Sequence, residues 1–235
     1  MNEKDGPSTV DYWEKSHRLR GTISHWALVV RRRLYQAFLE CVRPGPDDTI
    51  VDIGVTPDTE FEDTNFLERW LPDPSRITAT SIEDASVLEQ QFPGLRFVQT
   101  TDGPLPFDDH QFSIAFSSAV VEHVGNRQQQ KAFVREQLRI SDKFFMTTPN
   151  RWYPLELHTI LPFIHWLPQP VHQQLLRWMG KDQWAKTENL NLLSAKQLRA
   201  LFPADCTVTV SGVRTLGLRS NLFAYGTSST REQGR

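Results

Sequence analysis

Short apolar runs alternate with amphipathic segments from about residue 22 to residue 149. In 22–41, apolar residues recur at spacings of three and four, which predicts a helix. Strands are expected at 49–54, 76–82, 95–100, 112–118 and 143–149, with helices at 65–71, 84–92 and 126–140 between them. This alternation predicts an α/β fold: a Rossmann-like, doubly wound, mostly parallel sheet with helices on both faces.

The pattern changes after residue 149. Residues 150–193 are rich in proline and aromatic side chains and hold four of the seven tryptophans. We expect an aromatic helical insert that serves as a substrate-side pocket or lid, although tryptophans also form the cores of small helical caps. Beyond it, a helix is expected at 194–202, and 206–214 and 220–226 are expected to pair as antiparallel strands at the sheet edge.

These boundaries predict a tail and helix over 1–44, one domain over 45–226 that includes the insert, and a disordered tail over 227–235. A chain of 235 residues suits a single domain. The formal net charge of -2 gives no basic excess, which argues against nucleic-acid binding.

The polar N-terminus has no apolar region of a secretory signal, and no apolar run approaches the roughly 20 residues of a spanning helix. The two cysteines, Cys41 and Cys206, make no metal pattern, so no metal site is expected. Without a disulfide framework, a reducing, cytoplasmic location is expected, and contact with a membrane surface is left open.

Three consecutive arginines, Arg31, Arg32 and Arg33, interrupt the apolar pattern of the first helix. Successive helical residues diverge by about 100°, so they cannot form one basic face. We interpret them as a solvated flank, with a membrane-surface or phosphate-binding patch as the alternative.

The first predicted strand ends in Asp52-Ile53-Gly54, followed by the sequence VTPD. In open parallel sheets, ligands bind beyond the carboxyl ends of the strands. A glycine there lets the backbone approach a ligand, and a carboxylate accepts hydrogen bonds. A pyrophosphate loop needs several glycines, which are missing here, so a nicotinamide-dependent oxidoreductase is disfavoured.

The next two strand ends carry further polar groups. The two oxygens of Glu83 suit the hydroxyls of a ribose, and Ile82 can pack against a flat ring or against the core. Alternatively, Asp84 or Ser86 only caps the following helix. Asp102 lies in a tight Asp-Gly turn, where it either contacts a ligand or merely forms the turn.

After the fourth strand come Ser117, Glu122 and His123. A histidine titrates near neutral pH, which suits acid–base chemistry, although a structural role for His123 is the alternative.

Read in order, VDIG, RITATSIED, DGPLPFDDHQFSIAFSSAVVEHV and FFMTTPNRWYP resemble class I S-adenosylmethionine-dependent methyltransferases. The resemblance is strongest to the small-molecule and lipid-precursor branch, spans about residues 45–150, and is most specific in the block LPFDDHQFSIAFSSAVVEHV. It implies the cofactor S-adenosyl-L-methionine. By position, it places Asp52 and Gly54 at the methionine part of the cofactor, Ile82 and Glu83 beside adenine and ribose, Asp102 near the adenine amine, and Ser117 along the cofactor floor.

The sequence departs from the family pattern at two places. The glycine-rich loop is replaced by VTPDTE, and the acidic residue that ends the second strand is Ser81, with Glu83 two residues later. We expect Thr56 or Asp58 to face the cofactor in compensation.

Methyl transfer mainly requires alignment of the nucleophile with the methyl group, and a hydroxyl acceptor also needs a base. His123 is the first candidate base, followed by His158 and Glu156. The acceptor-binding residues are expected in the insert: Arg151, Trp152, Tyr153, Glu156 and His158. The expected function is methyl transfer to a small molecule, a glycan or a lipid-linked acceptor; the rival is a non-catalytic binding or scaffold protein with the same fold.

Overall fold

The computed structural model describes residues 20–156 and 158–228, so the predicted N-terminal tail and most of the C-terminal tail lie outside the described residues. One sheet of seven strands has the order β3-β2-β1-β4-β5-β9-β8. The strands are β1 (Ile50–Ile53), β2 (Ile77–Ser81), β3 (Arg96–Gln99), β4 (Phe112–Ser118), β5 (Ser141–Pro149), β8 (Thr207–Thr215) and β9 (Leu218–Thr227). Strands β1 to β5 pair in parallel, whereas β9 is antiparallel to both β5 and β8. The predicted fold class is confirmed.

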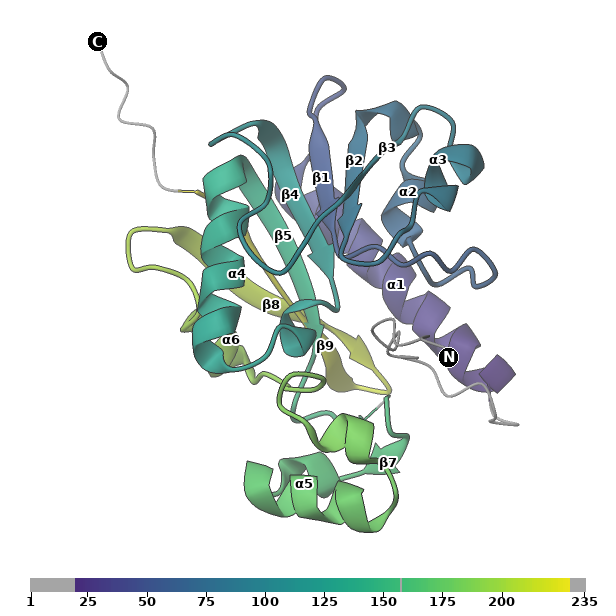
Figure 1. The fold of residues 1–235 in the computed structure, drawn as a ribbon, viewed down its shortest axis with the longest axis vertical. Helices are drawn as coiled ribbons and strands as arrows, with labels where there is room; N and C mark the ends of the chain where they lie inside the picture. Colours follow the sequence, from purple (N-terminus) through teal and green to yellow (C-terminus); the bar gives the residue numbers. More distant parts are fainter. Residues whose placement is uncertain (1–19, 157, 229–235) are drawn as a thin grey trace, which may run out of the picture.

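Helices cover both faces of this sheet (Figure 1). Helices α1 (Arg20–Val42), α2 (Phe66–Trp70) and α3 (Val87–Gln91) lie on one face. Helices α4 (Arg127–Ile140) and α6 (Ala195–Arg199) lie on the other. The apolar stripe of α1 packs Leu34 and Phe38 against Phe116 and Phe145 of the sheet, and all four side chains are fully buried.

Helix α3 is shorter than the sequence pattern predicts. It begins at Val87 because the Asp84 carboxylate accepts a hydrogen bond from the Ser86 N–H at 3.0 Å and holds a turn there. Asp84 lies before the helix, and Ser86 at the N-cap position makes no side-chain capping hydrogen bond, so the capping alternative is not borne out. Two 3-10 turns, η1 (Pro74–Arg76) and η2 (Val121–His123), complete the sheet domain.

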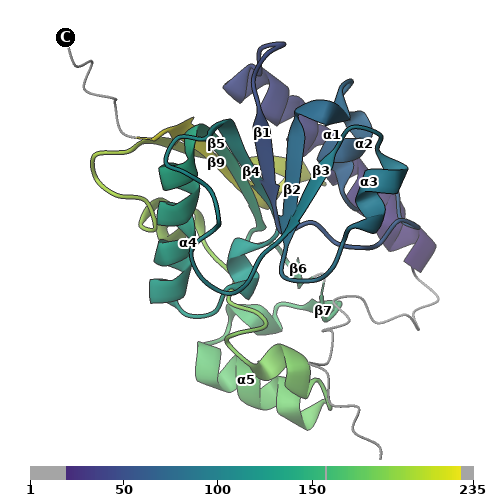
Figure 2. The same ribbon diagram turned by 45° about the horizontal axis from the view of Figure 1, so that its top comes forward.

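The insert forms a separate lobe beyond the carboxyl ends of the parallel strands (Figures 1 and 2). Besides the expected helix it contains a short hairpin, and its elements are β6 (Leu155–Glu156), β7 (Leu161–Pro162), η3 (Ile164–Trp166), α5 (Gln169–Trp178) and η4 (Asp182–Ala185). Its small core contains Leu176, Trp184, Ala185, Leu190 and Leu192. Only Trp184 of the four insert tryptophans is buried, and Trp178 is 77% exposed.

Among the described residues, no helix is both long enough and apolar enough to span a membrane.

Candidate functional site

Gly54 directly follows β1, the strand that lies between β2 and β4 where the strand order reverses. It has a φ of 91°, and its N–H donates to the Thr80 carbonyl at 2.7 Å. A Cβ at this position would lie 2.4 Å from a methyl carbon of Val120. Glycine is therefore required both by the backbone conformation and by the close approach of the β4–η2 segment.

Two buried carboxyl groups lie beside this strand end. Burial raises the pKa of Asp52 well above its ordinary value, and the neighbouring carboxyl of Glu68 raises that pKa further. Burial also raises the pKa of Glu68, and the adjacent Asp52 carboxyl opposes that rise. The pair forms a site that would favour a cation. Sequence reasoning identified Asp52 but missed Glu68, whose only signal was its place between the apolar residues Leu67 and Leu71.

Arg31 of α1 reaches into the same edge. Its Nη1 donates to the Ser118 hydroxyl at 2.8 Å, and its guanidinium lies 5.5 Å from the centroid of the Phe66 ring. Burial lowers the pKa of Arg31, and the carboxylates of Asp63, Glu122 and Asp52 oppose that shift. The interpretation of Arg31 as a solvated flank is therefore wrong, whereas Arg32 and Arg33 are exposed. The spacing could have indicated that Arg31 faces the sheet, because it precedes the buried Leu34 by three residues and the buried Phe38 by seven.

The loop that replaces the glycine-rich turn is held by Asn65. The Asn65 side chain accepts from the Thr56 N–H at 3.1 Å and donates to the Thr56 and Asp58 carbonyls at 2.8 and 3.3 Å. The Thr56 hydroxyl accepts from the Asp58 N–H, and the Asp58 carboxylate accepts from the Glu60 N–H. Both predicted cofactor contacts, Thr56 and Asp58, therefore use their side chains inside the loop.

The other predicted cofactor residues are distributed around the edge. Ile82 directly follows β2 and is 57% exposed, while Glu83 is half-buried, with its N–H bonded to the Ser81 hydroxyl. Asp102 is exposed in the loop after β3. Ser117 is fully buried and its hydroxyl is directed at Gln137 of α4, at 3.4 Å, so the Ser117 side chain lies on the opposite face of the sheet from Asp52.

A second cluster contains Glu122, His123 and His158. One side-chain nitrogen or oxygen of each lies within 4.8 Å of the others, and the two histidine rings meet edge to face with centroids 4.9 Å apart. Glu122 is fully buried; its Oε2 accepts from the Thr148 hydroxyl at 2.8 Å, and burial raises its pKa. The structure thus brings together both histidines that the sequence suggested as bases.

The two rings differ in their surroundings. The Nδ1 of His123 lies 2.6 Å from the Asn189 carbonyl, and burial lowers the pKa of His123 to about 3. The Nδ1 of His158 lies 2.6 Å from the Glu156 carboxylate. Burial opposes a charge on His158, but Glu156 outweighs it and raises the His158 pKa.

Glu156 is buried and fully hydrogen-bonded. It accepts from His158 and from the N–H and hydroxyl of Thr159, each at 2.7 Å. Burial alone would raise its pKa, but the His158 ring and these hydrogen bonds lower it to about 2. Glu156 therefore orients His158 and has little capacity left for a substrate.

The remaining predicted acceptor residues follow β5. The Arg151 guanidinium lies over the Trp152 ring, 5.8 Å from its centroid, and donates to the Leu167 carbonyl. Trp152 is 54% exposed, and the Tyr153 carbonyl lies 2.8 Å from His165 Nε2. These residues connect the sheet domain to the insert.

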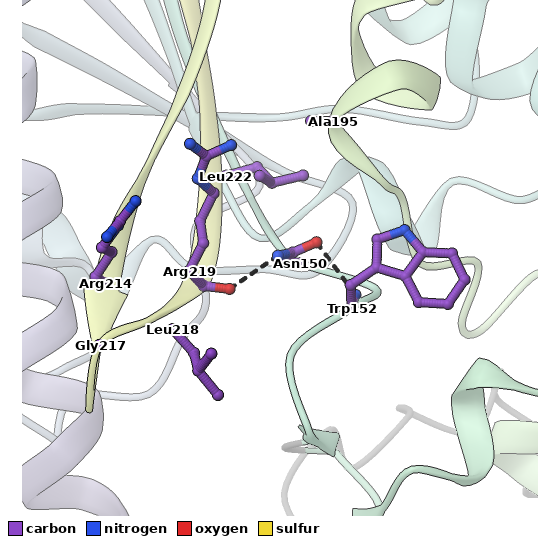
Figure 3. A pocket seen from close by; sticks show the side chains of 8 residues that line it. All are labelled: Asn150, Trp152, Ala195, Arg214, Gly217, Leu218, Arg219 and Leu222. Carbon is purple, nitrogen blue, oxygen red and sulfur yellow. Dashed lines mark hydrogen bonds between the residues drawn. The ribbon is translucent and has the colours of Figure 1, made fainter.

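A shallow pocket of about 340 Å³ lies farther along this edge, where β9 begins (Figure 3). Figure 3 shows Asn150 between Arg219 and Trp152, bonded to the Arg219 carbonyl and to the Trp152 N–H. Of the residues predicted from the sequence, only Trp152 lines it. The pocket is therefore distinct from the β1–β4 edge.

No family model matches this chain, and no curated protein matches its sequence. Several solved structures share its fold. Magnesium protoporphyrin IX methyltransferase from Synechocystis has a TM-score of 0.55 and 11% identity over 92% of this chain and 91% of its own. An N-methyltransferase from Bradyrhizobium japonicum has a TM-score of 0.51 and 12% identity over 84% and 86%. Both of these were solved with S-adenosylhomocysteine.

A methyltransferase from Methanosarcina mazei, described as S-adenosylmethionine-dependent, has a TM-score of 0.52 and 16% identity over 80% of this chain and 95% of its own. At these identities the similarity establishes the architecture alone. The chain has the Rossmann-like fold of S-adenosylmethionine-dependent methyltransferases.

Proposed function

We propose that this protein binds S-adenosyl-L-methionine beyond the carboxyl ends of β1, β2 and β4 and transfers its methyl group to a small-molecule, glycan or lipid-linked acceptor. The observation that carries the proposal is the buried carboxyl pair of Asp52 and Glu68 beside Gly54. Paired buried carboxyl groups are costly to a fold unless a cation or a proton compensates them. The cofactor carries both an ammonium and a sulfonium group.

The residues at this edge fit the cofactor at three points. Gly54 lets the backbone approach a ligand, Ile82 presents an exposed apolar surface for an adenine face, and Glu83 follows it directly. The cofactor has no phosphate, so the glycine-poor loop does not count against it. Asp102 would lie at the adenine edge, while Thr56, Asp58 and Ser117 would contribute through their backbones.

The acceptor is proposed to lie between the sheet edge and the insert. Bound cofactor supplies an electrophilic methyl group, and the protein has to hold an acceptor oxygen in line with it. Arg151, Trp152 and Tyr153 offer a cation and aromatic surface for that purpose. The cluster that contains His123 and His158 would receive the hydroxyl.

The two histidines are not equivalent as bases. His123 is neutral at pH 7, but a pKa of about 3 makes it a weak base. His158 is held by Glu156 and is the stronger proton acceptor of the two. We therefore assign proton acceptance to His158 and positioning to Glu156.

A second candidate function is a non-catalytic binding or scaffold protein with this fold. Two observations favour it: Val120 packs directly against Gly54, and Arg31 enters the same edge. Both would have to move or pack against the cofactor. This candidate predicts no methyl transfer to any acceptor, even if the cofactor binds.

Isothermal titration with S-adenosylhomocysteine tests the proposal. We expect binding in the micromolar range and a loss of about 10- to 100-fold in Asp52→Asn, because a charge-assisted hydrogen bond to the ligand contributes about 1.5–3 kcal/mol. The matched control is Asp205→Asn, an exposed carboxylate in the loop before β8. Absence of binding at millimolar ligand would overturn the methyltransferase proposal; binding without turnover would favour the scaffold.

A further inference from the structure

We infer that Glu122, His123 and His158 form a binding site for a divalent transition-metal ion, of the zinc or manganese type. The inference goes beyond the proposed methyl transfer and stands on the geometry of these three side chains; with an ion bound, Nε2 of His158 would be a ligand and could not also accept the proton of the acceptor. Two imidazoles and one carboxylate are a ligand set that first-row metals use, with further positions left open. No sequence pattern predicts this site, since its ligands come from two segments more than thirty residues apart.

The ligand atoms are spaced closely enough to bind one ion. They lie within 4.8 Å of one another, and the distance from His123 Nε2 to Glu122 Oε1 is 3.9 Å. Donor atoms around a tetrahedral zinc ion are about 3.3 Å apart, given zinc–nitrogen distances of about 2.0 Å. Small side-chain rotations therefore suffice to bring the three atoms to an ion.

Both histidine rings are oriented by acceptors at Nδ1. His123 Nδ1 faces the Asn189 carbonyl and His158 Nδ1 faces Glu156, both at 2.6 Å. A carbonyl and a carboxylate both accept, so each Nδ1 carries a proton, and Nε2 is the lone-pair atom in the neutral ring. Metal-binding histidines characteristically make such hydrogen bonds from the nitrogen that does not bind the ion.

One buried oxygen of Glu122 lacks a hydrogen-bond partner among the described residues. Glu122 is fully buried, Thr148 donates to its Oε2, and its Oε1 has no hydrogen-bond partner among the described residues. Buried polar atoms are rarely left without a partner. A cation between Glu122 and the rings would supply one. Each of the two histidine side chains is 13% exposed, which leaves a path for an ion to enter.

Metal titration of the untagged full chain tests the inference. We expect one equivalent of Zn²⁺ or Mn²⁺ to bind at micromolar concentration by calorimetry and to raise the melting temperature, while Mg²⁺ at the same concentration does neither. Glu122→Gln and His158→Gln should each weaken binding by about 100-fold. Glu156→Gln, which leaves the ligands intact, should weaken it by about 10- to 100-fold.

The matched control is His110→Asn, because His110 also pairs with a carboxylate, Asp142, at 2.9 Å but lies outside the cluster. It should bind the metal as the unaltered chain does. Circular dichroism of each metal-free variant establishes whether it is folded. Because two ligand variants are tested, the inference can still be tested if one of them does not fold. The inference is overturned if the unaltered chain binds no transition metal, or if both folded ligand variants bind as tightly as the unaltered chain. Because no cofactor enters this assay, its outcome is independent of S-adenosylhomocysteine binding.

Discussion

At the scale of single residues, the buried pair of Asp52 and Glu68 ties the stability of the chain to pH. Burial raises the pKa of both groups above their ordinary values of 3.8 and 4.5, and the charge of Glu68 raises that of Asp52 further. A carboxyl whose pKa is raised by folding binds protons more tightly in the folded state. Its contribution to the stability of the fold is therefore fully present below the pKa that the group has in the unfolded chain. That contribution is lost as the pH rises through the pKa that the group has in the folded chain.

Replacing Glu68 with glutamine should therefore stabilise the protein at pH 7 by about 1–2 kcal/mol, because one buried charge is removed. The gain should shrink as the pH falls toward 4.5, because a falling pH favours protonation of the unaltered pair. Urea unfolding of Glu68→Gln and the unaltered chain at both pH values measures the difference. Glu40→Gln, on the exposed side of α1, is the control and should show no such pH dependence. A Glu68→Gln gain that is equal at both pH values would contradict the assignment.

At the scale of elements, the loop between β1 and α2 is built around one side chain. Asn65 makes three hydrogen bonds to Thr56 and Asp58 and adopts a left-handed conformation, with a φ of 46°. Asparagine tolerates that conformation better than most residues. The loop thus gains order from asparagine where related loops use glycines to approach the ligand.

The variant Asn65→Ala should lose about 2–4 kcal/mol of stability, since it removes these bonds and places alanine in the left-handed region. Backbone amides of 55–64 should exchange hydrogen faster in this variant than in the unaltered chain. Asn65→Gly separates the two causes: it accepts the positive φ, so it should recover part of the stability while the loop still exchanges fast. Protection of 55–64 that is unchanged in both variants would show that Asn65 does not hold the loop.

At the scale of the whole molecule, the sheet could be predicted because its signals are local. Apolar runs and the residues between them placed all seven strands of the sheet, and the antiparallel end of the sheet was expected. Arg31, Glu68 and Glu122 could not be assigned in the same way. Their roles depend on neighbours from other elements, such as Ser118 for Arg31 and Asp52 for Glu68. Two other sites depend on side-chain direction, which a linear pattern does not show. These are the turn that the Asp58 side chain forms and the face of the sheet on which the Ser117 side chain lies.

The insert exposes several apolar side chains to solvent beyond the sheet edge. Phe163, Trp178 and Met179 are each at least half exposed, and Arg177 directly precedes Trp178, the last residue of α5. Exposed apolar patches of this kind mark interaction surfaces, and tryptophan with basic residues suits the interface of an anionic bilayer. We propose that this lobe contacts membranes that carry a lipid-linked acceptor.

Flotation with anionic vesicles tests that contact. The unaltered chain should float with the vesicles, and the double variant Trp178→Ser, Met179→Ser should lose most of this binding, because burial of the two side chains contributes about 1.5–3 kcal/mol each. Val87→Ser, which alters an exposed apolar residue on α3, away from the insert in Figure 1, is the control and should float normally. If the unaltered chain stays at the bottom of the gradient, the membrane contact is wrong. The acceptor would then be a dissolved small molecule or glycan, and the exposed tryptophans would belong to a different interface.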